Sequence, residues 1–273
     1  MKQKLLILLL ACYSLTVHAA KVDTVTVWSA SMNKSIPNLV ILPDQYADTK
    51  LNFPVLYLLH GAGGNHTNWL AKVPRLKAYV DAYNLIIVCP DGGETSWYFD
   101  SPVDDQMRYE TYMAEELISS IDSIYNTLAD KSGRAITGLS MGGHGALYLA
   151  FKHQDIWGAA GSMSGGVDIR PFPNNWDLPK RLGTYAEHKN NWEEHTVINL
   201  VYKLQADRLK LIIDCGIDDF FYEVNKRLHE KLLERNIPHD YIERPGQHNW
   251  AYWKNAIAYQ LLFFDKHFKR SDR

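Results

Sequence analysis

A serine stands between two glycines in the segment Gly138-Leu139-Ser140-Met141-Gly142. The G-x-S-x-G pattern is typical of a nucleophile elbow when a strand precedes it and a helix follows. Residues 134–137 are predicted to form that strand, and residues 143–151, rich in Ala, Leu and Gly, are predicted to form the helix. A serine held at such a bend can attack a carbonyl carbon. Ser140 is therefore the candidate nucleophile, the alternative being a plain Gly-rich turn with a solvated serine.

A serine nucleophile needs a base, and the base needs an acid that fixes its tautomer. With this kind of elbow, the order along the chain is serine, acid, histidine. Asp218 and Asp219 follow a predicted strand at 209–215, and strand ends face the crevice of a parallel sheet. We prefer Asp219 as the acid, the alternative being that both carboxylates cap the next helix. His248 lies in a loop between the last predicted strand and the last predicted helix, so it is the candidate base.

The Gly-rich segment His60-Gly61-Ala62-Gly63-Gly64 follows an early predicted strand. In hydrolases with a nucleophile elbow, such a loop supplies one N–H of the oxyanion hole, and the residue after the serine supplies the other. The predicted donors are therefore the backbone N–H groups of Ala62 and Met141. The alternative is a plain Gly-rich turn, and a phosphate site is disfavoured because no G-K-[ST] follows. His60 and His66 have no carboxylate or cysteine at the usual ligand spacing, so we predict neither a metal nor another cofactor.

Predicted strands and helices alternate along the chain, which favours an α/β fold with a mostly parallel sheet covered by helices on both faces. The first two strands are expected to form an antiparallel edge pair. Residues 167–204 interrupt the alternation with several prolines, Trp176 and Trp192, and are predicted to be an insertion over the active site. The predicted strands are 22–29, 38–42, 53–59, 85–89, 134–137, 159–164, 209–215 and 239–244, and the predicted helices are 68–83, 109–128, 143–151, 221–235 and 250–268.

Residues 1–19 have the pattern of a secretory signal peptide: Lys2 and Lys4, a short apolar run, and a small-residue cleavage site ending at Ala19. We therefore expect an exported protein, periplasmic or extracellular. Lipoprotein processing at Cys12 is the alternative, because the residues before it loosely fit a lipobox. The apolar run is too short to span a membrane.

The remaining residues, 20–273, are of a length that suits one domain with a substantial core. The net charge is −2 before the leader lysines are removed, and the chain has no basic stripe, so nucleic acid is not an expected partner. Cys89 and Cys215 each end an apolar run and are predicted to be buried free thiols, the alternative being a disulfide. No pattern in the sequence indicates the oligomeric state.

Several segments together resemble the esterase D type of esterases, from about residue 38 to residue 268. That family includes feruloyl and acetyl-xylan esterases of carbohydrate esterase family one, tributyrin esterases, S-formylglutathione hydrolases and mycolyltransferases. The resemblance implies an α/β-hydrolase fold and also selects Asp219, three residues after the strand-end glycine. The segments that carry it are Leu58-Leu59-His60-Gly61, Pro90-Asp91-Gly92-Gly93 with Ser96-Trp97-Tyr98, Gly138-Leu139-Ser140-Met141-Gly142-Gly143, Cys215-Gly216-Ile217-Asp218-Asp219-Phe220, and His248-Asn249-Trp250 with Trp253.

The resemblance implies a secreted serine esterase that acts on acetyl or feruloyl esters of carbohydrates, with a small-molecule or oligosaccharide ester as its partner. Trp97, Tyr98, Trp250 and His60 are then expected at the substrate, whereas aromatic residues equally often fill a core. His144 is expected to be a packing residue. Open alternatives are a general short-chain esterase, an S-formylglutathione-type thioesterase, an acyltransferase to a sugar, and an inactive carbohydrate-binding protein.

Overall fold

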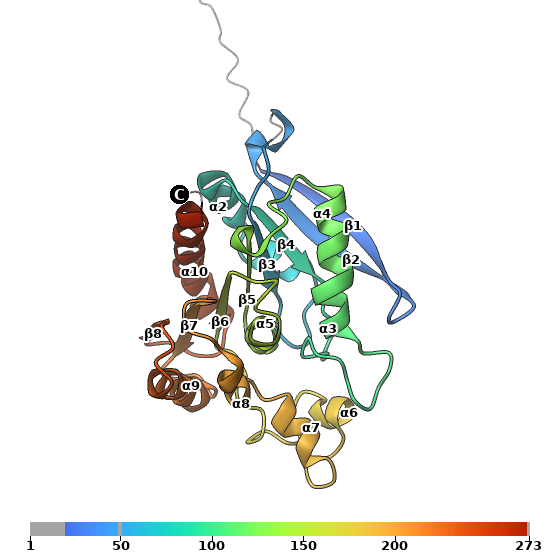
Figure 1. The fold of residues 1–273 in the computed structure, drawn as a ribbon, viewed down its shortest axis with the longest axis vertical. Coiled ribbons are helices and arrows are strands. Elements are labelled where there is room, and N and C mark those ends of the chain that lie inside the picture. Colours follow the sequence, from blue (N-terminus) through green and yellow to red (C-terminus); the bar gives the residue numbers. More distant parts are fainter. Residues whose placement is uncertain (1–19, 49–50, 272–273) are drawn as a thin grey trace, which may run out of the picture.

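An eight-stranded sheet runs through the protein in the order β1-β2-β4-β3-β5-β6-β7-β8 (Figure 1). The computed structural model describes residues 20–48 and 51–271, so the predicted leader lies outside the described residues. The strands are β1 (Lys21–Ser29), β2 (Lys34–Leu42), β3 (Val55–Leu59), β4 (Ile86–Pro90), β5 (Arg134–Gly138), β6 (Ala159–Met163), β7 (Lys210–Gly216) and β8 (Asp240–Arg244). The predicted antiparallel edge pair of β1 and β2 is confirmed; β2 joins β4 antiparallel, and the pairs from β4 through β3 to β8 are parallel.

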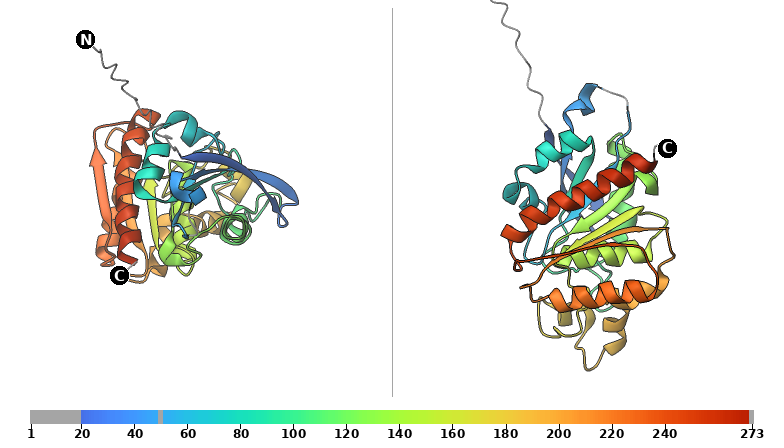
Figure 2. Two further views of the ribbon diagram at one scale, coloured as in Figure 1. Left: turned by 90° about the horizontal axis from the view of Figure 1, so that it is seen from above. Right: turned by 90° about the vertical axis from the view of Figure 1, so that its left-hand side faces the viewer.

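Helices cover both faces of the sheet, as predicted (Figures 1 and 2). Helices α2 and α10 lie on one face, and α4, α5 and α9 lie on the other. The helices are α1 (Asn68–Lys72), α2 (Leu76–Tyr83), α3 (Tyr109–Thr111), α4 (Ile118–Ile124), α5 (Met141–Lys152), α6 (Leu178–Leu182), α7 (Lys189–Glu194), α8 (Val197–Leu200), α9 (Tyr222–Glu234) and α10 (Trp250–Ser271). Short 3₁₀ helices occupy Asp44–Asp48, Lys131–Gly133 and Val201–Lys203, and a π-helical turn occupies Tyr112–Leu117.

The central strand β3 shows how the core forms on both faces. Val55, Tyr57 and Leu59 pack into the cluster with α4, α5 and α9, whereas Leu56 and Leu58 pack into the cluster with α2 and α10. Every side chain of this strand is buried, which explains its uninterrupted apolar sequence. Each fully buried aliphatic side chain contributes roughly 1.5–3 kcal/mol of transfer free energy. The sheet is therefore a rigid base for the loops at its carboxyl edge.

Two predicted helices differ from the structure. The helix predicted at 68–83 is two helices, because Pro74 has no N–H to continue the ladder and its ring clashes with the preceding turn. The helix predicted at 109–128 ends at Ile124 and contains the π-helical turn. Over the described residues, no helix combines the length and apolar character needed to cross a membrane.

Candidate active site

Ser140 lies at a strained bend between β5 and α5. Its backbone has φ 54° and ψ −119°, a conformation that a non-glycine residue rarely adopts. The flanking glycines make the bend possible. A Cβ on Gly142 would lie 2.5 Å from the carbonyl oxygen of His60, and one on Gly138 would lie 2.6 Å from the backbone of Gly142. The elbow predicted from the sequence pattern is therefore present in the backbone.

His248 reaches Ser140 from the loop between β8 and α10. Its Nε2 lies 2.9 Å from the hydroxyl oxygen of Ser140, and its Nδ1 lies toward Asp219. With a proton on Nδ1 donated to the carboxylate, Nε2 is free to accept the hydroxyl proton of Ser140. The two side chains are thus in the geometry that a base and a nucleophile require.

Asp219, rather than Asp218, contacts the histidine. The side chain of Asp219 is fully buried, and its two oxygens lie 3.0 and 2.9 Å from Nδ1 of His248. One of these oxygens also accepts the N–H of Phe221 at 2.8 Å. Asp218 is exposed, and its backbone N–H donates to the carbonyl of Gly246. The structure therefore brings together Ser140, His248 and Asp219 from three separate loops at the carboxyl edge of the sheet.

Asp214 has a different task inside β7. Its buried carboxylate accepts hydrogen bonds from the Tyr252 hydroxyl at 2.5 Å and from Arg244 at 2.6 Å. Tyr252 belongs to α10 and Arg244 ends β8, so this carboxylate ties together the two elements that flank the loop of His248.

The predicted oxyanion donors both lie near Ser140. Ala62 and Ser140 line one groove, and Met141 is the first residue of α5. In the part of the chain that the structure describes, the N–H groups of Ala62 and Met141 have no protein acceptor. The loop is shaped by its neighbours, since Gly63 donates to the carbonyl of Glu94 and Gly64 to that of Gly61. Two free amides, one at a helix N-terminus, suit an oxygen that becomes negative.

His60, which was predicted to contact the substrate, is a buried residue in the structure. It is buried with 1% of its surface exposed, and both ring nitrogens have partners. Nδ1 donates to the carbonyl of Gly61, and Nε2 accepts the N–H of Gly92, each at 2.8 Å. Burial lowers the pKa of His60, which favours this neutral form. His60 therefore joins the two loops that follow β3 and β4.

Trp97 and Tyr98 were also predicted to line the cleft, and the structure places both in the core. They are 1% and 0% exposed, respectively. The Tyr98 ring fills the space where Gly92 and Gly145 lack side chains, and its hydroxyl donates to the carbonyl of His60 at 3.2 Å. The Trp97 ring packs against His144, whose position confirms the expected packing role. Trp97 and Tyr98 are therefore packing residues that support the loops of the site.

A groove of about 430 Å³ lies over Ser140, and Trp250, which was predicted to contact the substrate, is on its wall. Sequence reasoning missed how Phe220 and Trp253 surround the imidazole of His248, with ring centroids 4.2 and 4.9 Å away. Of the insertion's tryptophans, Trp176 lines the groove, whereas Trp192 is fully buried and donates to the carbonyl of Gly183. The lining residues are Gly61, Ala62, Gly63, Gly64, Asn68, Leu139, Ser140, Trp176, Phe220, His248, Trp250 and Trp253.

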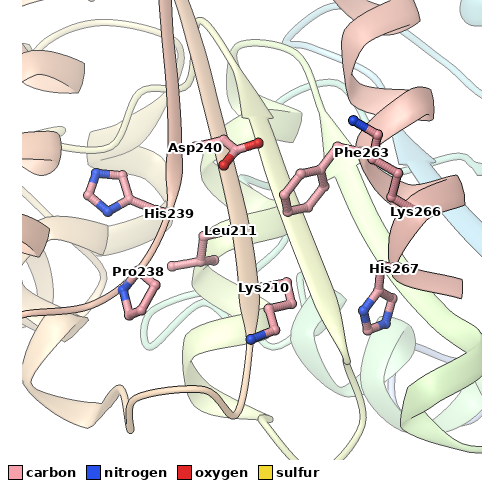
Figure 3. A pocket seen from close by; sticks show the side chains of 8 residues that line it. All are labelled: Lys210, Leu211, Pro238, His239, Asp240, Phe263, Lys266 and His267. Carbon is pink, nitrogen blue, oxygen red and sulfur yellow. The ribbon is translucent and has the colours of Figure 1, made fainter. Parts of the chain in front are cut away.

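Another cavity, of about 460 Å³, lies at the opposite ends of the strands, where β7 and β8 begin beside α10 (Figure 3). Lys210, His239 and Lys266 are among the residues lining it, far along the strands from Ser140.

Nowhere in 20–48 and 51–271 do three or more His, Cys, Asp or Glu side chains gather in a group that could hold a metal ion. Cys89 and Cys215 are buried free thiols, as predicted, and burial raises the pKa of each.

The chain is similar to known esterases. A family model described as "Putative esterase" matches residues 29–264. "Esterase MT1326" of Mycobacterium tuberculosis (strain CDC 1551 / Oshkosh) is 34% identical over 247 residues, which are 81% of this chain and 53% of the relative, so the chain spans about half of that protein. "Acetyl esterase" of Caldicellulosiruptor saccharolyticus is 28% identical over 261 residues, covering 88% of this chain and 96% of the relative.

A solved structure named ferulic acid esterase superposes with a TM-score of 0.79 at 29% identity, covering 91% of this chain and 98% of its own. The fold predicted from the sequence is thereby confirmed as that of the α/β-hydrolase esterases. Because the family model matches most of the chain, the protein belongs to this esterase family.

Proposed function

We propose that this protein is a serine carboxylic-ester hydrolase in which Ser140 is the nucleophile, His248 the general base and Asp219 the orienting acid. The observation that carries the proposal is the continuous contact from Ser140 through His248 to Asp219, with steps of 2.9 Å at each end. A half-buried serine on a strained turn, an imidazole and a buried carboxylate have no packing reason to meet in this order. They do have a chemical one.

The reaction follows from the contacts. The Ser140 oxygen bonds to the ester carbonyl carbon, its proton passes to Nε2 of His248, and the carbonyl electron pair moves onto oxygen. That oxyanion accepts hydrogen bonds from the N–H groups of Ala62 and Met141. The carbon–alcohol bond breaks as His248 returns the proton to the leaving oxygen, which releases the alcohol and leaves an acyl-serine. Water then repeats the sequence, releasing the carboxylic acid and restoring Ser140.

Asp219 has two effects on this reaction. Its carboxylate keeps the Nδ1 proton in place, so Nε2 faces Ser140 with its lone pair. It also stabilises the imidazolium that forms when Ser140 loses its proton. Because the carboxylate is fully buried, water screens this attraction less than it would at the surface.

The proposed substrates are acetyl or feruloyl esters of carbohydrates. Support comes from the relatives named acetyl esterase and ferulic acid esterase, and from the groove, where Trp250 and Trp176 offer flat apolar faces beside Ser140. The proposal includes export after cleavage near Ala19, which would bring the enzyme to polymeric substrates. Amino-terminal sequencing of the protein recovered from the periplasm or medium tests that part.

A substrate panel tests the chemistry. Purified protein is assayed with acetylated xylo-oligosaccharide, feruloylated arabino-oligosaccharide, tributyrin and S-formylglutathione. The sugar esters are expected to give the highest kcat/KM. A tenfold preference for the triglyceride or the thioester, about 1.4 kcal/mol of transition-state binding, would overturn the carbohydrate assignment and leave the esterase assignment in place. Hydrolysis of none of the four would overturn both.

A further inference from the structure

Phe220 is an exposed aromatic residue held in a fixed position beside the candidate base. Its surface is 52% exposed, yet the centroid of its ring lies 4.2 Å from that of the His248 ring. Trp176 stacks on it at 5.7 Å with an interplanar angle of 20°. Trp176 and Asp177 both have positive φ, at 47° and 55°, so the insertion adopts a strained turn where it delivers this tryptophan.

Two hollows meet at Phe220 and His248. The first is the groove over Ser140, which contains the loop of Ala62. The second has a volume of about 510 Å³ and is lined by Ile217, Asp218, Asp219, Phe220, Gln247 and His248. Phe220 and His248 line both hollows, so they form the boundary between them.

The backbone beneath the second hollow is fixed by contacts between two loops. The N–H of Ile217 donates to the carbonyl of Arg244 at 2.9 Å, and that of Asp218 donates to the carbonyl of Gly246 at 3.0 Å. Gly216 permits this approach, because a Cβ there would lie 2.3 Å from the carbonyl oxygen of Gly246. The second hollow is therefore preformed rather than assembled by a ligand.

The proposed chemistry gives the two hollows different occupants. The oxyanion must lie beside Ala62 and Met141, on the side of the first hollow. The leaving oxygen must lie within hydrogen-bond reach of Nε2 of His248, because it takes its proton from there. That oxygen therefore lies in the first hollow, where Nε2 faces Ser140, and an alcohol longer than one ring can extend past Phe220 and His248 into the second hollow.

The side chains of the second hollow suit a molecule with hydroxyl groups and an apolar face. Ile217 and Phe220 are 44% and 52% exposed. Among the described residues, neither the Asp218 carboxylate nor the Gln247 amide has a hydrogen-bond or ion-pair partner in the protein. A carboxylate accepts hydroxyl protons, an amide can donate and accept, and apolar side chains can cover the C–H face of a ring.

We propose that the second hollow is the binding site for the alcohol part of the substrate, and that this alcohol is polyhydroxylated, with Asp218 and Gln247 bonding its hydroxyl groups. The inference rests on the proposed function, since it uses His248 as the group that protonates the leaving oxygen. It adds the place and the residues that select the alcohol, separately from those that hold the acyl group.

The test compares two esters with the same acyl group and different alcohols, acetylated xylobiose and p-nitrophenyl acetate. Both give the same acetyl-enzyme, so any difference in kcat/KM between the two esters arises in the steps up to release of the alcohol. Asp218→Ala and Gln247→Ala should each lower kcat/KM for acetylated xylobiose about tenfold, while kcat/KM for p-nitrophenyl acetate stays within about twofold. Glu230→Ala, which removes an exposed carboxylate on α9, is the matched control and should change neither.

Other results have distinct meanings. Equal losses on both esters, or no loss on either, would overturn the inference. A parent protein that hydrolyses p-nitrophenyl acetate but not acetylated xylobiose would also overturn it, while the proposed function stood. A parent that hydrolyses neither would overturn the proposed function itself. Asp218 and Gln247 are both exposed, so the variants are expected to fold, and circular dichroism verifies this.

Discussion

The carboxylate of Asp219 lies against Nδ1 of His248 through both of its oxygens, at 3.0 and 2.9 Å, and no part of that side chain is exposed. Its neighbour Asp218 is exposed and is not hydrogen-bonded to His248. Of these two consecutive residues, Asp219 therefore holds the imidazole and Asp218 faces solvent.

This relationship predicts opposite outcomes for two matched substitutions. Asp219→Asn should lower kcat for p-nitrophenyl acetate by about 10⁴-fold, because an amide N–H facing Nδ1 favours the wrong tautomer. Asp218→Asn should leave kcat within about twofold. Steady-state kinetics on both variants decide the matter, and equal losses or the reverse order would move the acid to another residue.

Trp97 and Trp250 differ in burial, so their substitution should separate stability from substrate binding. Trp97→Ala should lower the free energy of unfolding by about 3–5 kcal/mol, because it empties a fully buried site. Trp250→Ala should cost less stability and raise KM, because Trp250 is on the wall of the groove. Urea unfolding and steady-state kinetics of both variants test this, and a larger rise in KM for Trp97→Ala would return Trp97 to the substrate site.

His144 should make the protein less stable in acid. Burial lowers the pKa of His144 to about 4, outweighing the carbonyl groups of His195 and Trp97, whereas the unfolded chain has the ordinary value of 6.5. As the pH falls from 6.5 toward 4, the unfolded chain takes up a proton here and the folded protein does not. The stability given by the neutral side chain is present above pH 6.5 and is lost across that window, with a slope of up to about 1.4 kcal/mol per pH unit.

Urea unfolding between pH 7.5 and 4 measures this dependence. His144→Gln should flatten the slope in the window, although it also lowers stability at every pH. His188→Gln replaces an exposed histidine and should leave the slope unchanged. The account of His144 would be wrong if both variants retained the slope of the parent protein.

The sequence predicted the positions of the three candidate catalytic residues better than the surroundings of the site. Ser140, Asp219 and His248 lie where strands end, and the order of elements along the chain is enough to place strand ends at one edge of a parallel sheet. The antiparallel edge pair of β1 and β2 was also visible in the pattern of the sequence, whereas the order of the strands in the sheet was not predicted. By contrast, Trp97 and Tyr98 lie in a loop, where no periodicity indicates which way a side chain points.

The wrong predictions for Tyr98 and His60 share a physical cause. Tyr98 fills space left by Gly92 and Gly145, and His60 is fixed by two backbone groups, so each depends on contacts between segments distant in sequence. Phe220 was missed because its place beside His248 involves stacking on Trp176, which comes from an insertion that has no regular pattern. The break at Pro74 was, in contrast, visible in the sequence and should have divided the helix.

The most direct test is covalent labelling of Ser140. A fluorophosphonate should form one adduct per chain, mapped by peptide mass spectrometry to Ser140, and excess ester substrate should slow the labelling. Ser140→Ala should form no adduct and retain no more than about a thousandth of the parent activity, with an unchanged unfolding midpoint. An adduct on another residue, or a Ser140→Ala protein that still hydrolyses esters at a rate close to that of the parent, would contradict the account.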